Sequence, residues 1–313
     1  MSSEHQRIER IRQLFQRPSR HVVLGIGDDC AVLAPSALPQ VWTVDTAVEN
    51  VHFSRSFMSC RQIAYRAFMA AASDIAAMGG RATAALSSLS LPRAFSDAEL
   101  DDLLAGTVAA ADLLRVVVAG GNLARASELS LCTSVFGECP AKVLRRDSAS
   151  VGDGVFVTGT LGGASLGLSA LQAGEPEDGP YAASIARFLR PLARLDVADS
   201  VARVASSAID VSDGLIQDLL HVCNSSRVGA TLRSESLPRL PDFDALARQR
   251  GHEPNALLLG GGEDYELLFT APLASVPAEL ATCIGVVEAQ PGLRVLDASG
   301  APLPDVAGFD HFR

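Results

Sequence analysis

The sequence has little lysine, few aromatic residues and no long apolar run. Lys142 is the only lysine among the 26 basic residues, and aromatic residues make up 5% of the 313 positions. With 36 acidic residues the formal net charge is −10, so the chain has no general attraction for phosphate backbones and we expect no nucleic acid partner. No segment approaches the roughly 20 apolar residues of a membrane-spanning helix, so we expect no membrane partner either.

Several common site motifs are also missing. None of the six cysteines belongs to a C-x-x-C pair, which argues against a zinc site. Residues 1–20 are polar and charged, so we expect no secretory leader and a cytoplasmic protein with reduced thiols. The phosphate-binding G-x-x-x-x-G-K-[ST] loop is absent. Gly25-Ile26-Gly27 does not open a dinucleotide-binding loop, because Asp28 and Asp29 would meet the pyrophosphate.

What the sequence does contain is ample apolar material for a core. Hydrophobic residues make up 48% of the chain, and its length suggests two domains. Strand-like and helical patterns are mixed on both sides of a turn-rich segment at residues 139–152. We therefore predict an α/β (α+β) fold with an N-terminal half, residues 1–138, that binds ATP and metal, and a C-terminal α/β half, residues 139–313.

The expected elements follow from these patterns. Helices are expected at residues 7–15, 61–78, 97–114, 164–171 and 181–189, and a further amphipathic helix after Gly214. Strands are expected at residues 21–24, 41–45, 84–91, 116–118, 129–136, 155–158, 207–211, 267–270 and 283–287.

Carboxylates gather at the ends of the expected strands in the first half. Asp28 and Asp29 follow a Gly-Ile-Gly turn, where a solvated turn is the simplest explanation. Asp45 ends the next strand, with Thr43 and Thr46 beside it. Further along, Asp74 lies on the apolar face of the helix expected at 61–78. A carboxylate so placed must be paired, hydrogen-bonded or bound to a cation, because bare burial is costly.

The second half carries acids in two glycine-containing segments. Asp210 and Ser212 are expected on one face of a strand end, and Asp213 precedes Gly214 and a helix, where N-capping is the default explanation. Glu263 follows Gly260-Gly261-Gly262, a run that lets the backbone approach a ligand closely but that would also suit a hairpin turn.

Together these acids favour magnesium, which takes hard oxygen ligands along with substrate phosphates. Acidic turns without a P-loop suit a polyphosphate held through metal ions, and such sites transfer phosphoryl groups by positioning and charge neutralisation. Arginines such as Arg125 and Arg146 could contact phosphate oxygens. The residues alone indicate no more than a metal–nucleotide enzyme.

The order of the motifs carries a closer resemblance. From Gly25 to Leu267 the chain contains GIGDDCAVL, TVDTAVENVHF, SDIAAMGG, the pair Gly120-Gly121, GDGVFVTGTLGGASLGL, IDVSDGL and GGEDYEL, in that order. With the terminal GFDHF, these segments closely resemble the thiamine-monophosphate kinases, which share a superfamily with aminoimidazole ribonucleotide synthetase and selenophosphate synthetase. GDGVFVTG alone would indicate only the superfamily.

The resemblance implies transfer of the γ-phosphate of ATP to thiamine monophosphate by a homodimer that associates through strands of the N-terminal half. Several Mg²⁺ ions would be held by Asp29, Thr43, Val44 (through its backbone), Asp45, Asp74, Asp210 and Asp213, and Asp45, Asp74 and Asp210 would be catalytically essential. ATP contacts would fall on Gly121, Asn122, Arg146 and Ser212, and substrate contacts on His52, Glu263 and Phe309.

One position departs from the family pattern. After Gly120-Gly121 the family typically has Asp and then hydroxyl residues, whereas this chain reads Asn122-Leu123-Ala124-Arg125. Three interpretations follow: an active kinase with a modified metal site, a related ATP-dependent enzyme with another small-molecule acceptor, or a weakly active homologue that binds nucleotide or thiamine phosphate. Asn122 could also simply cap a turn. The intact acids favour the first interpretation.

Overall fold

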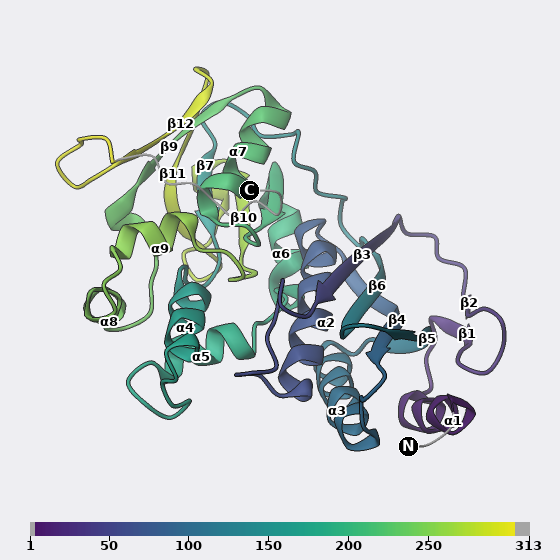
Figure 1. The fold of residues 1–313 in the computed structure, drawn as a ribbon. Coiled ribbons are helices and arrows are strands. Elements are labelled where there is room, and N and C mark those ends of the chain that lie inside the picture. The colour runs from purple at the N-terminus through teal and green to yellow at the C-terminus, as the bar shows by residue number, and fades with distance from the viewer. Residues whose placement is uncertain (1–3, 304–313) are drawn as a thin grey trace. The chain divides into compact units, whose positions relative to one another are not determined.

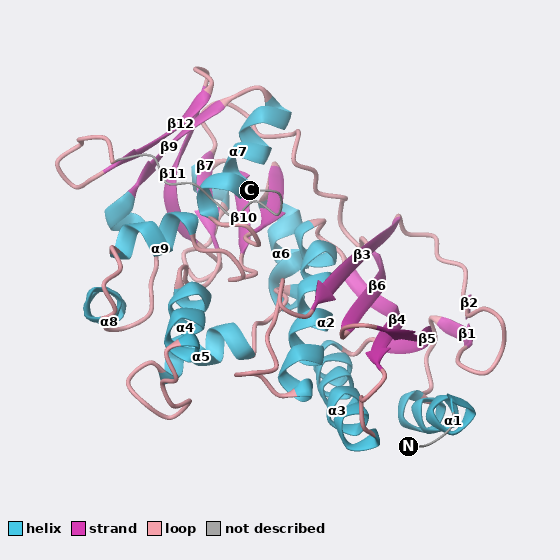
Figure 2. Cartoon of the chain, viewed as in Figure 1, coloured by secondary structure: helices cyan, strands magenta, loops and turns pink. Residues whose placement is uncertain are grey.

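The computed structural model describes residues 4–303, and its chain forms two compact units (Figure 1). Unit 1 contains the chain up to Ile75 and Gly80–Pro140. Unit 2 contains Ala76–Gly79 and the chain from Ala141 onward. Each unit has its own sheet, as Figure 2 shows. Across the described residues, no helix is both long enough and apolar enough to cross a membrane.

Unit 1 is built on a four-stranded sheet in the order β3-β6-β4-β5. Strands β4 and β5 are parallel, and the other neighbours are antiparallel. The helices α2 and α3 lie along the sheet (Figure 2). The elements of this part are α1 (Glu4–Phe15), β1 (Val22–Leu24), β2 (Val32–Leu33), β3 (Gln40–Val48), α2 (Cys60–Ala77), β4 (Arg81–Pro92), α3 (Asp97–Leu114), β5 (Val117–Ala126) and β6 (Ser130–Glu138).

One face of this sheet is buried and the other carries exposed apolar side chains. Helix α2 buries Phe68 and Ile75, and Ile75 approaches Gly137 of β6. On β3, Thr43 reaches a residue of α2, so the alternating residues Trp42 and Val44 face away from that helix. Their side chains are 69% and 62% exposed. The open face of the sheet is therefore partly apolar.

Unit 2 is built on a six-stranded sheet in the order β12-β9-β11-β7-β10-β8. Only the pair β12 and β9 is parallel among these described strands. The elements are β7 (Gly154–Val157), α4 (Gly163–Gln172), α5 (Ala182–Leu189), α6 (Leu195–Val204), β8 (Ser207–Asp210), α7 (Leu215–Ser226), β9 (Gly229–Arg233), α8 (Phe243–Gln249), α9 (Pro254–Gly260), β10 (Leu267–Ala271), β11 (Thr282–Glu288) and β12 (Gly292–Leu296).

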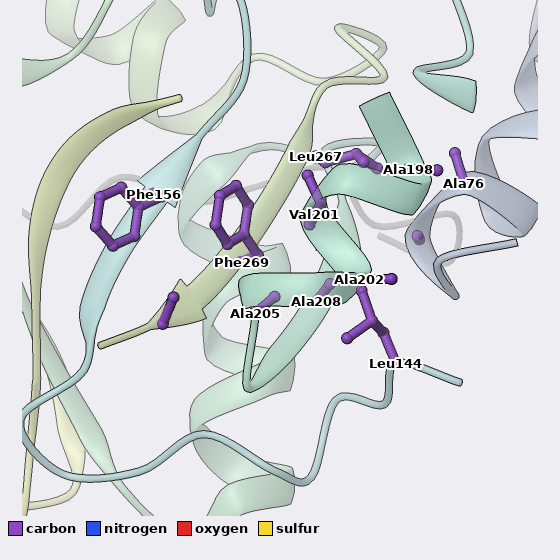
Figure 3. Packing of buried hydrophobic residues seen from close by; sticks show 12 residues of the cluster. Ala76, Leu144, Phe156, Ala198, Val201, Ala202, Ala205, Ala208, Leu267 and Phe269 are labelled. Carbon is purple, nitrogen blue, oxygen red and sulfur yellow. The ribbon is translucent and has the colours of Figure 1, made fainter. Parts of the chain in front are cut away.

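A cluster of small and aromatic side chains fills part of the core of unit 2 (Figure 3). Phe156 of β7 and Phe269 of β10 stack with their ring centroids 5.5 Å apart. Helix α6 contributes Ala198 and Val201, both fully buried. Small residues on this helix let it lie close to the sheet, because alanine leaves room for backbone approach.

The predicted mixed α/β fold is confirmed, and every expected helix and strand is present. Most bounds agree within a few residues, but the strand expected at 116–118 continues as β5 to Ala126. Helix α3 has the predicted bounds. The alternative in which Asn122 caps a turn is wrong, because β5 continues through this residue and pairs it with Ser88 of β4. The prediction missed β2, α6, β9, α8, α9 and β12.

Candidate functional site

The predicted site residues are divided between the two units. Unit 1 carries Asp29, Thr43, Val44, Asp45, His52, Asp74, Gly121 and Asn122. Unit 2 carries Arg146, Asp210, Ser212, Asp213 and Glu263. The remaining prediction, Phe309, lies outside the described residues.

Within unit 1, Thr43 of β3 and Asp74 of α2 are in direct contact. The Thr43 hydroxyl donates to Asp74 Oδ2 over 2.5 Å. Asp74 is half-buried, so the sequence expectation that this acid needs a partner is met by a neutral hydroxyl. The contact orients one carboxylate oxygen of Asp74. Both groups offer oxygen atoms of the kind that magnesium prefers.

A cavity of about 1400 Å³ in unit 1 brings three other predicted residues to one surface. Asp29, Gly121 and Asn122 line it, together with Trp42 and residues of α1. Asp29 is exposed, and its N–H donates to Asp28 Oδ1 over 2.8 Å. Asp45 is also exposed, and its Oδ1 accepts the N–H of Thr46 over 2.7 Å.

The pair Gly121-Asn122 lies in the parallel ladder between β4 and β5. A Cβ atom at position 121 would lie 1.9 Å from the Ser87 carbonyl oxygen, so strand packing alone requires glycine there. Asn122 is exposed and does not cap a turn. The alternative that Asn122 only caps a turn is therefore wrong, whereas a functional role for its amide is compatible with its position on the cavity wall.

His52 follows β3 in a tight turn. Its Nδ1 accepts the backbone N–H of Val48 over 3.1 Å, while its own backbone N–H donates to the Val48 carbonyl. In the neutral imidazole this arrangement places the proton on Nε2. His52 is thereby oriented as a hydrogen-bond donor, a property suited to a phosphate oxygen.

In unit 2, Asp210 is buried at the end of β8, and the chain turns at residues 211–214 into α7. Ser212 and Asp213 are both half-buried in this turn. Helix α7 begins after Gly214 without a side-chain cap, so the expectation that Asp213 serves as an N-cap is wrong. Its Oδ2 instead accepts a hydrogen bond from Gln217 over 3.3 Å.

Asp218 is a residue of this turn that the sequence analysis missed. Its Oδ2 accepts the backbone N–H groups of residues 212, 213 and 214. Burial, and then repulsion from Asp210 and Asp213, raise the pKa of Asp218 to about 8. The signal in the sequence was an acid four residues after a glycine that begins a helix.

The segment that carries Glu263 lies against the same turn. Glu263 donates its backbone N–H to the Ser212 carbonyl over 2.8 Å, and Tyr265 donates to the Val211 carbonyl over 2.9 Å. The glycines before Glu263 join α9 to β10, so the hairpin alternative is wrong. The structure thus brings Glu263 together with Ser212.

Buried acids on both sides of Tyr265 anchor this segment. Asp264 accepts the backbone N–H groups of Gly162 and Ala164 at the start of α4. Burial raises the pKa of Asp264 to about 7. Glu266 accepts hydrogen bonds from Thr158, Arg187 and Arg194. These anchors hold Glu263 at a left-handed backbone angle, φ 66°.

Arg146 is exposed in unit 2, and its backbone carbonyl accepts the Ser226 hydroxyl over 2.9 Å. Its guanidinium can therefore reach an anion at the surface. Between residues 4 and 303, no group of three or more His, Cys, Asp or Glu side chains is arranged as a metal site. The donors present are nonetheless carboxylate and hydroxyl oxygens, the chemistry that fits magnesium.

Comparison with known proteins defines the class of this fold. Residues 27–139 match the AIR synthase related protein N-terminal domain, and residues 150–297 match the AIR synthase related protein C-terminal domain. The fold is shared with the crystal structure of hydrogenase maturation protein HypE in complex with ATP. That chain is 17% identical, with a TM-score of 0.77 over 98% of this chain and 96% of its own. The chain is an AIR synthase related protein.

More similar proteins narrow the family. The thiamine-monophosphate kinase of Escherichia coli K12 is 36% identical over 93% of this chain and 92% of its own. The crystal structure of thiamine-monophosphate kinase from Stenotrophomonas maltophilia has 34% identity and a TM-score of 0.83 over 94% of this chain and 96% of its own. AaThiL complexed with AMPPCP and TMP has 32% identity and a TM-score of 0.82, over 97% of this chain and 96% of its own. The chain belongs to the thiamine-monophosphate kinase family, which confirms the resemblance drawn from the motifs.

Proposed function

We propose that this protein transfers the γ-phosphate of ATP to thiamine monophosphate, forming thiamine diphosphate and ADP. The observation that carries the proposal is the match over nearly the whole chain to AaThiL, whose structure holds AMPPCP and TMP. In the reaction a phosphate oxygen of thiamine monophosphate forms a bond to the γ-phosphorus. The bond from that phosphorus to the bridging oxygen breaks, and ADP leaves with the electron pair.

Mg²⁺ is the cofactor in this proposal. Its ligands would be Asp29, Thr43, the Val44 carbonyl, Asp45, Asp74, Asp210 and Asp213. Bound magnesium would neutralise phosphate charge, so that two polyanions can approach each other. The chain contributes preorganisation. The Thr43 hydroxyl orients Asp74, and the turn at 211–214, which contains Asp213 and directly follows Asp210, is held by hydrogen bonds to Asp218. Asp45, Asp74 and Asp210 are the proposed catalytic residues.

The proposal also assigns contacts to the two substrates. For ATP these are Gly121, Asn122, Arg146 and Ser212. For thiamine monophosphate they are His52, Glu263 and Phe309. The Nε2 proton of His52 supports a hydrogen bond to phosphate. Glu263 could accept from a donor on the cationic substrate, and its backbone bond to Ser212 couples the two binding segments.

The proposal also includes a division into two halves, residues 1–138 and 139–313, and a homodimer. The exposed pair Trp42 and Val44 on β3 supports pairing through strands of the N-terminal half, because apolar side chains at such positions gain by burial. We also propose a cytoplasmic location without nucleic acid or membrane partners. The six cysteines, all in the described part of the chain, are thiols and form no disulfide, which suits that compartment.

The test is incubation with ATP, magnesium and thiamine monophosphate, followed by chromatography. Thiamine diphosphate and ADP are expected, and excess chelator should stop their formation. AMP as the nucleotide product, or turnover undiminished by chelator, would rule the proposal out. Free thiamine serves as the control acceptor and should react poorly, because it lacks the phosphate that receives the γ-phosphoryl group.

A further inference from the structure

A single side-chain oxygen holds the turn that joins β8 to α7. Asp218 Oδ2 lies 3.0 Å from the backbone nitrogen of Ser212 and 3.1 Å from those of Asp213 and Gly214. The Asp218 side chain belongs to the first turns of α7 and is 2% exposed. Three consecutive amides therefore converge on one buried acceptor, an arrangement that fixes the backbone of the turn more tightly than one cap would.

The N–H groups that donate to Asp218 lie where the chain leaves β8 and enters α7. Gly214 has φ 114°, and its N-terminal neighbours leave the strand before the helical hydrogen bonds of α7 begin. Amide N–H groups at a helix start lack intrahelical partners and need an external acceptor. The N–H of Asp218 itself donates to the Gly214 carbonyl over 3.0 Å, which closes the turn around the carboxylate.

The turn carries two of the proposed magnesium ligands and one nucleotide contact. Asp210 directly precedes it, Asp213 lies within it, and Ser212 lies between them. Asp218 holds the backbones of Ser212 and Asp213 directly, through the hydrogen bonds that it accepts from their N–H groups. These partners are backbone N–H groups, so Asp218 contributes to the geometry of the turn.

We infer that Asp218 is a positioning residue that holds the turn at 211–214 in the conformation from which Asp210 and Asp213 bind the metal. This inference rests on the proposed function. Asp218 acts through three backbone amides and is itself outside the proposed ligand set. Residues that orient metal ligands in this way commonly matter for metal affinity nearly as much as the ligands do.

The test compares Asp218→Ala with Asp218→Asn by two readouts that need no turnover. Mn²⁺ binding is titrated by electron paramagnetic resonance in the presence of AMPPCP, and amide hydrogen exchange is followed in peptides that span residues 211–214. Alanine removes the acceptor, so we expect the Mn²⁺ dissociation constant to rise by about 10- to 100-fold and exchange at 212–214 to accelerate. Asparagine keeps one acceptor oxygen and should restore most of both properties.

Asp153 provides the matched control. It is a buried aspartate, 6% exposed, whose carboxylate accepts the backbone N–H of Ser150 over 3.1 Å in the turn before β7. Asp153→Ala should lower the melting temperature without changing Mn²⁺ binding. Equal Mn²⁺ binding by wild type and Asp218→Ala would overturn the inference, as would equal weakening by Asp153→Ala.

The wild-type protein alone also tests the inference, should Asp218→Ala fail to fold. Its amides at 212–214 should be protected from exchange, and exchange at the rate of an unstructured chain would overturn the inference. Because neither readout uses turnover, a protein that binds Mn²⁺ with these properties but leaves thiamine monophosphate unchanged would overturn the proposed function alone.

Discussion

The hydroxyl of Thr43 donates to Asp74 Oδ2 over 2.5 Å and so links strand β3 to helix α2. This contact is compatible with two roles for Asp74, a satisfied core acid and a metal ligand. A core acid would be held by the threonine for stability, whereas a metal ligand would be oriented by it towards the ion. We propose the second role, because Asp74 is only half-buried and both groups offer oxygen atoms of the kind that magnesium prefers.

The first prediction concerns the catalytic acids. Asp74→Ala, Asp45→Ala and Asp210→Ala should each lower turnover by at least about 100-fold, because each removes charge that holds metal against phosphate. The melting temperatures of Asp74→Ala and Asp45→Ala should change little. That of Asp210→Ala should change little or rise, because this substitution relieves repulsion at Asp218. Steady-state assays run beside thermal melts measure both quantities.

The control for this series is Asp101→Ala. Asp101 is an acid on α3 that pairs with Arg10 at 3.0 Å and is outside the proposed ligand set. Its variant should keep wild-type turnover. If Asp74→Ala melts at a lower temperature but keeps full activity per folded molecule, then Asp74 is a core acid and the metal assignment for it is wrong.

How much the sequence could predict differs between local and non-local features. The bounds of α3 followed from local signals: Ser96 and Glu99 form a reciprocal capping box at its start. Strand β12 was missed because it pairs in parallel with β9, a partner far away in sequence. The glycine pair before Asn122 left a turn open as an alternative, but pairing with β4 excludes it.

The site shows the same division. The acids that motifs carry, such as Asp210 and Glu263, could be selected from the sequence and by resemblance. The role of Asp218 could not be predicted in this way, because it depends on three backbone amides that converge only once the turn has folded. The hydroxyl partner of Asp74 was likewise hidden, since Thr43 is 31 positions away in the chain.

The second prediction concerns Asn122. Its amide oxygen can ligate magnesium but brings no negative charge, so Asn122→Asp should lower the magnesium concentration needed for half-maximal rate. Magnesium is titrated against rate for both proteins at saturating ATP and thiamine monophosphate. Because Asn122 is exposed on β5, the substitution should leave the fold intact. Superimposable titration curves would show that position 122 does not contribute to metal binding.

The third prediction concerns the open face of the unit 1 sheet. Trp42 is 69% exposed and packs edge-on against Phe136, with ring centroids 5.1 Å apart. If this face forms the proposed dimer, then Trp42→Glu should convert dimers to monomers, because it would bury an unpaired charge. Sedimentation velocity measures the change.

Leu113→Glu is the control for the open face. Leu113 is an exposed apolar residue of α3, and its substitution should leave the dimer intact. A dimer that survives Trp42→Glu would place the interface elsewhere.

The fourth prediction concerns pH and stability. Burial raises the pKa of Asp264 to about 7, although Arg187 opposes the shift and Glu266 reinforces it. The folded state then binds a proton that the unfolded state has released, so this group's contribution to stability falls as pH rises. Between about pH 4 and about pH 7, stability should fall by up to about 1.4 kcal/mol per pH unit from this group.

Asp264→Asn removes that titration while it keeps one acceptor for Gly162 or Ala164. Urea unfolding of wild type and variant across this pH range gives the difference in unfolding free energy. As pH rises, the unfolding free energy of the variant should increase relative to that of wild type. A difference independent of pH would show that Asp264 stays ionised in the folded protein.

The central claim is direct transfer of the γ-phosphate of ATP to thiamine monophosphate. Its most direct test uses ATP labelled with ³²P at the γ position, together with magnesium and thiamine monophosphate, and follows the label after chromatography. The account predicts that the label appears in the terminal phosphate of thiamine diphosphate, in equal amount to the ADP formed. Label found only in inorganic phosphate, with thiamine monophosphate unchanged, would contradict it.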